Sequence, residues 1–246
     1  MLELEDIQHF LISRPPALAA RYEFLAFRRS GAGGEWLKGI LDKVGTSKAL
    51  ASGNPGTRWV TIGFTWNGLR ALGVNQDALA TFPEEFRQGM AARAEILGTT
   101  GANHPENWVG GLASEELHAI VILFARDVAE RERCRQEHRE YLLQCDGVKV
   151  LSSLDMEAIP PYTYAHEHFG YRDRLSQPVI EGMGEEPAPG SGPAIKAGEF
   201  FLGYPDENGP PAGLPHPEIL TRNGSYVAYL RIEEHVGASL FRPTYS

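Results

Sequence analysis

A single carboxylate between two guanidinium groups is the chemical feature of this sequence that most needs an explanation. Asp173 lies between Arg172 and Arg174 in the stretch HFGYRDRLSQPVIEG, residues 168–182. A carboxylate held in place can take up and release a proton during a reaction. The structural alternative is an acid that pins a loop, because hydrogen bonds from two cations lower its pKa and make it a poor proton donor. The residue types alone favour the structural alternative.

The neighbourhood of Asp173 is a loop that needs partial cover. Loops normally run over the surface of a protein, so a charged loop is usually solvated. This loop also holds apolar side chains, namely Phe169, Tyr171, Leu175, Val179 and Ile180. We therefore expect a half-buried loop that carries a carboxylate.

A metal site is the second chemical possibility that the sequence raises. His166 and His168 flank Glu167, and this spacing puts both rings on one side of a strand, as many metal sites require. No third ligand is marked by the sequence, so we predict no metal site. The glycines of GAGG, residues 31–34, lack the spacing of a phosphate-binding loop.

Composition excludes several classes of partner. The chain has 246 residues, with 23 lysines and arginines against 32 aspartates and glutamates, and a formal net charge of −9. The charges are interleaved and no basic face is present, which argues against nucleic acid and against anionic membranes as partners.

The predicted location is the cytoplasm. Cys134 and Cys145 fall in one predicted helix, where a rise of about 1.5 Å per residue puts them about 16 Å apart, too far for a disulfide. The first residues, MLELEDIQHF, lack the basic start of a signal peptide. No apolar run approaches the roughly 20 residues of a membrane span.

Strands and helices alternate along the first 159 residues. Apolar runs predict strands, and helical spacing with caps at Thr65 and Asp127 predicts helices. The predicted strands are 22–28, 58–64, 118–126 and 147–159, and the predicted helices are 35–44, 66–74, 83–98 and about 128–143. This order is typical of an α+β fold, a ferredoxin-like split βαβ antiparallel sheet backed by helices.

The character of the chain changes at residue 160. We predict a ferredoxin-like N-terminal domain over 1–159 and a segment rich in proline and glycine over 160–223. Residues 224–246, which begin with GSYVAYLRIEEHV, read as the first strand of an incomplete second domain.

Several stretches in order resemble the dye-decolourising (DyP-type) haem peroxidase family. FGYRDRLSQPVIEG, residues 169–182, resembles the family's distal haem motif, written Gly-x-x-Asp-Gly and followed by Ile-Ser-Gln-Pro. GEFFLGYPDENG, residues 198–209, is similar to its Gly-Glu-Phe-x-Leu-Gly-Tyr element. RNGSYVAYLRIEEHV, residues 222–236, resembles the Asn-Gly-Ser-Tyr strand that opens the family's second half. DIQHFLISRPP and WVTIGFTWNGLRALGV are compatible with its first half.

The resemblance implies a fold, a cofactor and a site. Two ferredoxin-like halves would form one unit of the dimeric α+β barrel type, with haem b held mainly in the second half. Gly170 takes the place of the motif's first glycine, and Asp173 that of the aspartate that moves a proton between the oxygens of bound peroxide. The other expected cofactor-binding residues are Arg172, Arg174, Leu175, Ser176 and Gln177.

The sequence departs from the family pattern in two ways. Arg174 stands where the motif has its second glycine, and it would either pair with a haem propionate or fill the space that haem needs. The family's proximal histidine and distal arginine come well after the Asn-Gly-Ser-Tyr strand, beyond Ser246. We therefore expect either a natural half-protein or a fragment of a longer one.

Two functions follow as expectations. The first is a DyP-type peroxidase that uses hydrogen peroxide to oxidise an organic electron donor and needs a C-terminal half to be active. The second is a haem-free binding or assembly module. It would form a homo-oligomer, or pair with a separate C-terminal polypeptide, through its last strand.

Overall fold

A four-stranded antiparallel sheet of order β2-β3-β1-β4 is the centre of the fold. The computed structural model describes residues 2–12, 15–51, 56–158, 169, 171, 178–184, 186–187, 189, 192–211, 213–233, 235 and 237. The strands are β1 (Ala19–Phe27), β2 (Arg58–Phe64), β3 (Ala119–Ala125) and β4 (Val148–Glu157). Strand β1 pairs with β3 and β4, and β2 pairs with β3. The predicted ferredoxin-like α+β class is confirmed.

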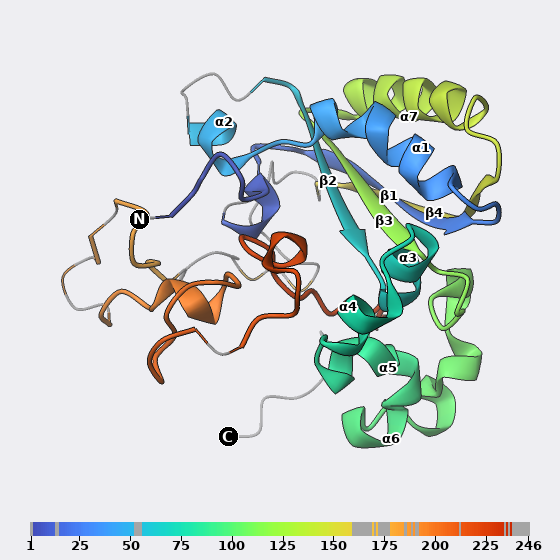
Figure 1. Cartoon of the computed structure of the whole chain (residues 1–246). Helices are drawn as coiled ribbons and strands as arrows, with labels where there is room; N and C mark the ends of the chain where they lie inside the picture. The colour runs from blue at the N-terminus through green and yellow to red at the C-terminus, as the bar shows by residue number, and fades with distance from the viewer. Residues whose placement is uncertain are drawn as a thin grey trace.

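Two helices cover one face of this sheet (Figure 1). They are α1 (Ala32–Ile40) and α7 (Val128–Leu142), and they enclose a core with alternate residues of the strands. In β3, Val121 belongs to this core, whereas Ile122 and Phe124 belong to a second cluster on the other face. Strand β3 is therefore buried on both faces, as its uninterrupted apolar sequence predicts.

The remaining helices are short, and most lie at one end of the sheet. They are α2 (Ser47–Ala51), α3 (Trp66–Ala71), α4 (Gln76–Ala80), α5 (Glu84–Ala92) and α6 (Ala94–Leu97). The 3-10 turns are η1 (His9–Leu11), η2 (Leu41–Lys43), η3 (Gly101–Asn103), η4 (Pro105–Asn107), η5 (Val109–Gly111), η6 (Ala197–Glu199) and η7 (Glu218–Leu220). Among the described residues, no helix has both the length and the apolar character needed to cross a bilayer.

Both predicted helix caps are confirmed. The side chain of Thr65 accepts a hydrogen bond from the amide of Gly68 at the start of α3. Asp127 accepts one from the amide of Glu130 at the start of α7. Each side chain satisfies a backbone donor that the first turn of a helix leaves without a partner.

Some predicted boundaries are wrong. The region predicted as one helix over 83–98 is two helices, α5 and α6, which Arg93 separates with non-helical angles. Within α5, Gly89 makes a kink with a φ of 71°. Helix α4, capped by Asn75, was not predicted. Strand β1 begins at Ala19 rather than residue 22, because Ala19, Ala20 and Arg21 pair with β3 as well.

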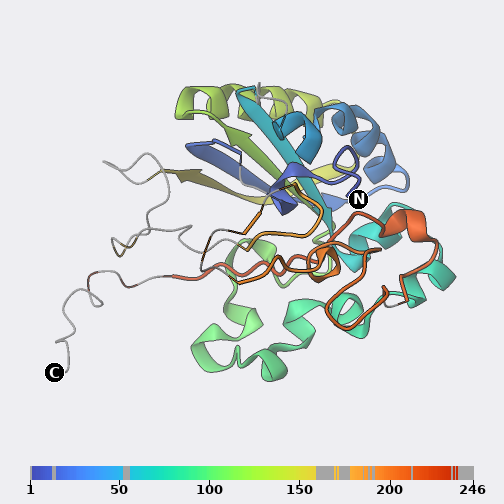
Figure 2. The same ribbon diagram turned by 90° about the vertical axis from the view of Figure 1, so that its left-hand side faces the viewer.

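The face of the sheet away from α1 and α7 is approached by the N-terminal residues and by the described residues between 178 and 233. Figure 2 shows residues 178–233, drawn orange to red, on the side of the sheet away from α1 and α7. Leu2 and Ile7 form a buried cluster with Ile180, Phe201 and Tyr204. The predicted boundary after residue 159 stays a prediction, and these contacts join the chain across it.

The predicted last strand does not form a ladder in this structure. Residues 224–233 are assigned to no strand, and no backbone hydrogen bond joins residues 225–233 to another described residue. Their apolar side chains are largely exposed, with Val227 at 64% and Ile232 at 70%. A sequence with strand character is thus present without a strand partner in the described part of the chain.

Candidate functional site

The predicted distal loop lies almost entirely outside the described residues. The predicted catalytic and cofactor-binding residues that fall there are Gly170, Arg172, Asp173, Arg174, Leu175, Ser176 and Gln177. His166 and His168 lie outside as well. Of the neighbouring residues, Phe169 is half-buried and the side chain of Tyr171 is exposed. The roles of these residues therefore stay predictions.

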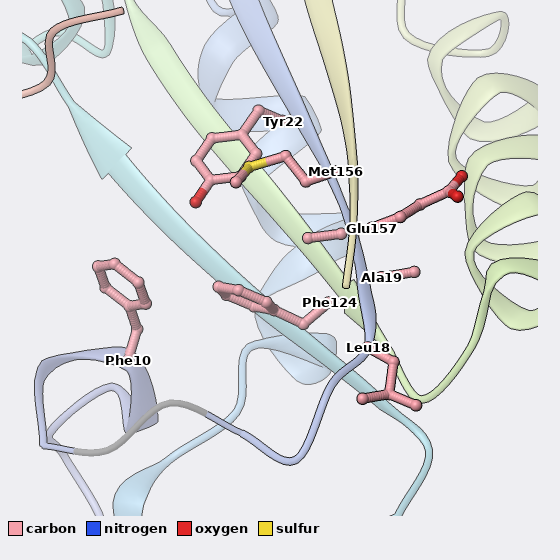
Figure 3. A pocket seen from close by; sticks show the side chains of 8 residues that line it. Phe10, Leu18, Ala19, Tyr22, Phe124, Met156 and Glu157 are labelled. Carbon is pink, nitrogen blue, oxygen red and sulfur yellow. The ribbon is translucent and has the colours of Figure 1, made fainter. Parts of the chain in front are cut away.

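Aromatic side chains gather on the sheet face that the helices leave uncovered, which we call the open face. Phe10 of η1 stacks on Phe124 of β3 with ring centroids 5.8 Å apart, and Tyr22 and Met156 lie close together on the neighbouring strands (Figure 3). A cavity of about 180 Å³ opens between these side chains. It is lined by Phe10, Leu18, Ala19, Ala20, Tyr22, Phe124, Met156 and Glu157.

Residues 225–233 cross this face on aromatic contacts. The ring of Tyr229 lies 6.0 Å from that of Tyr22 and 5.3 Å from that of Phe24, both on β1. The ring of Tyr226 lies 5.3 Å from that of Phe86 on α5. Burial raises the pKa of Tyr226 and of Tyr229. The segment thus connects the sheet to the short helices through side chains, with no backbone pairing to the residues that the structure describes.

A buried asparagine precedes this segment and joins three distant parts of the chain. The Nδ2 group of Asn223 donates to Oε2 of Glu3 at 2.7 Å and to Oδ2 of Asp6 at 2.8 Å. Its Oδ1 atom accepts a hydrogen bond from the Tyr204 hydroxyl at 2.5 Å. Arg222 donates to Glu3 at 2.9 Å, and hydrogen bonds from Arg222 and then Asn223 lower the pKa of Glu3 to about 2.

One ring nitrogen of each of His9, His118 and His138 has a polar partner within the protein, whereas Nδ1 of His9 and Nε2 of His138 are buried without a partner among the described residues. In His118, Nδ1 accepts the amide hydrogen of Phe27 at 2.8 Å, and burial, followed by the charge of Arg70, lowers the pKa of the ring. His9 is fully buried, with Nε2 3.4 Å from the hydroxyl of Thr61. Among the described residues there is no group of three or more His, Cys, Asp or Glu side chains placed to hold a metal.

Sequence reasoning missed both the Asn223 cluster and the open-face aromatics. Alternation in AARYEFLAF, residues 19–27, carries the signal for Tyr22 and Phe24 on one face of a strand. The Asn-Gly pair at 223–224 marks a turn. Nothing in the sequence near Glu3 or Asp6 indicates that Asn223 is their partner.

A family model and several curated proteins match the chain. Residues 42–152 match the model of the DyP dimeric alpha+beta barrel domain. A dye-decolorizing peroxidase of Mycena epipterygia is 28% identical over 191 residues, which cover 78% of this chain and 34% of that protein. Peroxidase 2 of Mycetinis scorodonius is 28% identical over 193 residues, which cover 78% of this chain and 35% of that protein.

Solved structures share the fold. A dye-decolorizing peroxidase in complex with 2,6-dimethoxyphenol superposes with a TM-score of 0.72 at 22% identity, covering 86% of this chain and 47% of that one. The decolorizing peroxidase of Auricularia auricula-judae superposes with a TM-score of 0.71 at 22% identity, covering 86% and 46%. At such identities the structures establish the fold alone. The chain spans about a third of the length of these curated relatives.

Proposed function

Because the family model, the curated relatives and the solved structures all point to the DyP-type peroxidase family, we propose that this chain is the N-terminal part of such a peroxidase. It would contribute to the oxidation of an organic donor by hydrogen peroxide. The observation that carries the proposal is the match of residues 42–152, which build β2, β3 and α7, to the family's barrel domain.

The described residues do not by themselves fit haem, which the family uses. The rings of His9, His118 and His138 each have a polar partner within the protein, and none of these rings lines the open-face cavity. That cavity, at about 180 Å³, is smaller than the roughly 300–1,000 Å³ of ordinary ligand pockets. We propose that haem b is held by the loop of residues 170–177 together with a second half of the protein.

Asp173 is the proposed acid–base residue, with Gly170, Arg172, Leu175, Ser176 and Gln177 beside the cofactor. For Arg174 both alternatives stay open: it pairs with a haem propionate, or it fills the space that haem needs. The chemistry of relatives suggests the donor class, since one solved DyP contains 2,6-dimethoxyphenol, a small phenol.

The test is reconstitution. The chain is prepared alone and together with the polypeptide encoded directly downstream of residue 246, and haem is added to both. We expect a Soret band, and peroxide-dependent oxidation of 2,6-dimethoxyphenol, only in the mixture. A mixture that forms a complex but stays colourless would overturn the proposal. Haem uptake by the Arg174→Gly chain alone would identify Arg174 as the plug.

A second candidate function is a haem-free assembly module. One observation favours it, namely that residues 225–233 combine exposed apolar side chains with a backbone that bonds to no other described residue, as a strand does before it joins a sheet. A second copy or a separate polypeptide would then complete the sheet. Mass measurement in solution decides, because a strict monomer that binds no downstream polypeptide would exclude this function.

We also propose that the protein works in the cytoplasm. Cys134 and Cys145 are both free and buried in the structure, which fits thiols kept reduced by that compartment. Detection of the tagged full chain in cytoplasmic and exported fractions tests the location.

A further inference from the structure

Asn223 sits at the point where the chain leaves the packed region for the extended residues 225–233. Its side chain is buried, with 3% exposed, and its φ of 64° lies in the left-handed region. Asparagine tolerates this region better than most residues, but an ordinary non-glycine residue avoids it. The unusual angle is maintained by the contacts around it.

Backbone contacts fix the turn at this residue on both sides. The amide of Asn223 donates to the carbonyl of Leu202 at 3.1 Å, and the amide of Leu202 donates to the carbonyl of Gly224 at 2.9 Å. The amide of Gly224 donates to Thr221 at 2.9 Å. After Gly224 the backbone bonds to described residues stop, so the turn at Asn223 sets the direction in which residues 225–233 leave.

The side chain of Asn223 must be an amide to hold this turn. Ionised carboxylates only accept hydrogen bonds, so Glu3 and Asp6 require a donor between them. The NH2 group supplies two hydrogens, one for each carboxylate, while the opposite oxygen accepts from Tyr204. A carboxylate at the buried position 223 would face the exposed carboxylates of Glu3 and Asp6 at hydrogen-bonding distance, and like charges this close repel.

We propose that Asn223 is a positioning residue that directs residues 225–233 across the open face (Figure 2). The ring of Tyr229 then rests on those of Tyr22 and Phe24. Its carboxamide hydrogen-bonds to the N-terminal residues Glu3 and Asp6 and so holds them against the turn at residues 221–224. The claim that this segment is presented to a second half rests on the proposed function. The claim that Asn223 sets its path does not.

The experiment uses trypsin cleavage after Arg231, which lies in this segment two residues beyond Tyr229. Cleavage in a folded protein reports how often the local segment opens. In the full chain, Asn223→Asp keeps the shape but removes both donors. We expect cleavage after Arg231 to accelerate by about tenfold or more, because hydrogen bonds to charged groups are lost. Cleavage at the arginines of α7 and after Lys149 of β4 should stay slow.

The matched control is Asn208→Asp. Asn208 is also followed by glycine, is exposed, and the substitution changes the net charge by the same amount. We expect its cleavage rate to stay within about twofold of the original, as is usual for exposed substitutions. Equal rates for Asn223→Asp and Asn208→Asp would overturn the positioning role. Equal acceleration at every site of the chain would also overturn it.

A rescue variant keeps the proposal testable if Asn223→Asp fails to fold. In Asn223→Asp combined with Asp6→Asn, the donor and one acceptor exchange places across the 2.8 Å contact. The coupling between two touching residues is what such a double-mutant cycle measures. We expect the double variant to fold and to be cleaved more slowly than Asn223→Asp alone, because the carboxylate at 223 regains one donor while the contact with Glu3 stays lost. A double variant as damaged as the single one would overturn the proposal, whatever the outcome of the haem experiment.

Discussion

The Nδ1 atom of His138 on α7 lies 2.7 Å from a carboxylate oxygen of Glu23 on β1, and both side chains are buried. Arg21 donates to the other oxygen of this carboxylate at 2.6 Å. Burial alone would raise the pKa of Glu23, but the hydrogen bonds and charges of His138 and Arg21 outweigh it and lower that pKa. The helix is thus attached to the sheet by a buried ionic group as well as by apolar packing.

Removing Glu23 should be costly for this reason. We expect Glu23→Ala to lower the free energy of unfolding by about 3–5 kcal/mol, because it leaves buried polar partners without a counter-charge. Urea unfolding measures the change. The control is Glu116→Ala, which breaks an exposed pair with Arg28 at 2.7 Å and should cost less than about 1 kcal/mol. Similar losses for the two variants would contradict the prediction.

Stability should fall as the pH drops below 6.5. Burial lowers the pKa of His9 from 6.5 to about 4, so the unfolded chain takes up a proton in this window and the folded chain does not. The contribution of His9 is complete above pH 6.5 and declines toward pH 4. At 1.36 kcal/mol per pKa unit, the contribution of His9 to the free energy of unfolding is roughly 3 kcal/mol. The lowered pKa of His118 acts in the same direction.

Urea unfolding at a series of pH values between 5 and 7.5 tests this dependence. We expect His9→Phe to flatten the dependence of the free energy of unfolding on pH, since it removes the histidine whose pKa is lowered to about 4. His235 is exposed and provides the control, and we expect His235→Phe to keep the slope. A slope that survives in His9→Phe would show that other groups carry it.

Two glycines provide a matched test of packing. A Cβ atom on Gly68 in α3 would lie 1.8 Å from the backbone oxygen of His118, whereas a Cβ on Gly34 in α1 would meet nothing within 4 Å. We expect Gly68→Ala to cost about 3 kcal/mol by overpacking. Gly34→Ala should raise the free energy of unfolding by about 0.5–1 kcal/mol, because alanine favours the helical conformation more than glycine does. Thermal unfolding measures both changes, and a loss in Gly34→Ala would contradict the second.

Under the proposed function, Asp173 should control the turnover of the complete protein. In the haem-loaded complex with its second half, we expect Asp173→Asn to lower kcat by about 10²–10⁴-fold, the usual range for losing an acid–base group. Asp77→Asn on the surface of α4 is the control and should leave kcat unchanged. Haem content is compared by absorbance. Full turnover by Asp173→Asn would remove this residue from the proposed mechanism.

Local signals predicted the elements that depend on local interactions. The bounds of β2 agree with the prediction, and Asp127 caps α7 as expected, since an apolar run and a capping side chain act within a few residues. The kink at Gly89 inside α5 was missed, because helical spacing continues through this residue although its φ of 71° is not helical. Such a glycine gains this conformation from its surroundings.

The sequence by itself determined the alternation of strands and helices, the family resemblance and the residues proposed for catalysis. Only the tertiary structure decided that Asn223 meets Glu3, 220 positions away, and that Glu23 meets His138, 115 positions away. In the sequence these charges look like ordinary solvated side chains. Glu23 and His138 meet because α7 packs on the sheet, and their burial makes the pairing obligatory, since an unpaired charge away from water is costly. Glu3 stays partly exposed and reaches Asn223 because Leu2 and Ile7 pack with Phe201 and Tyr204.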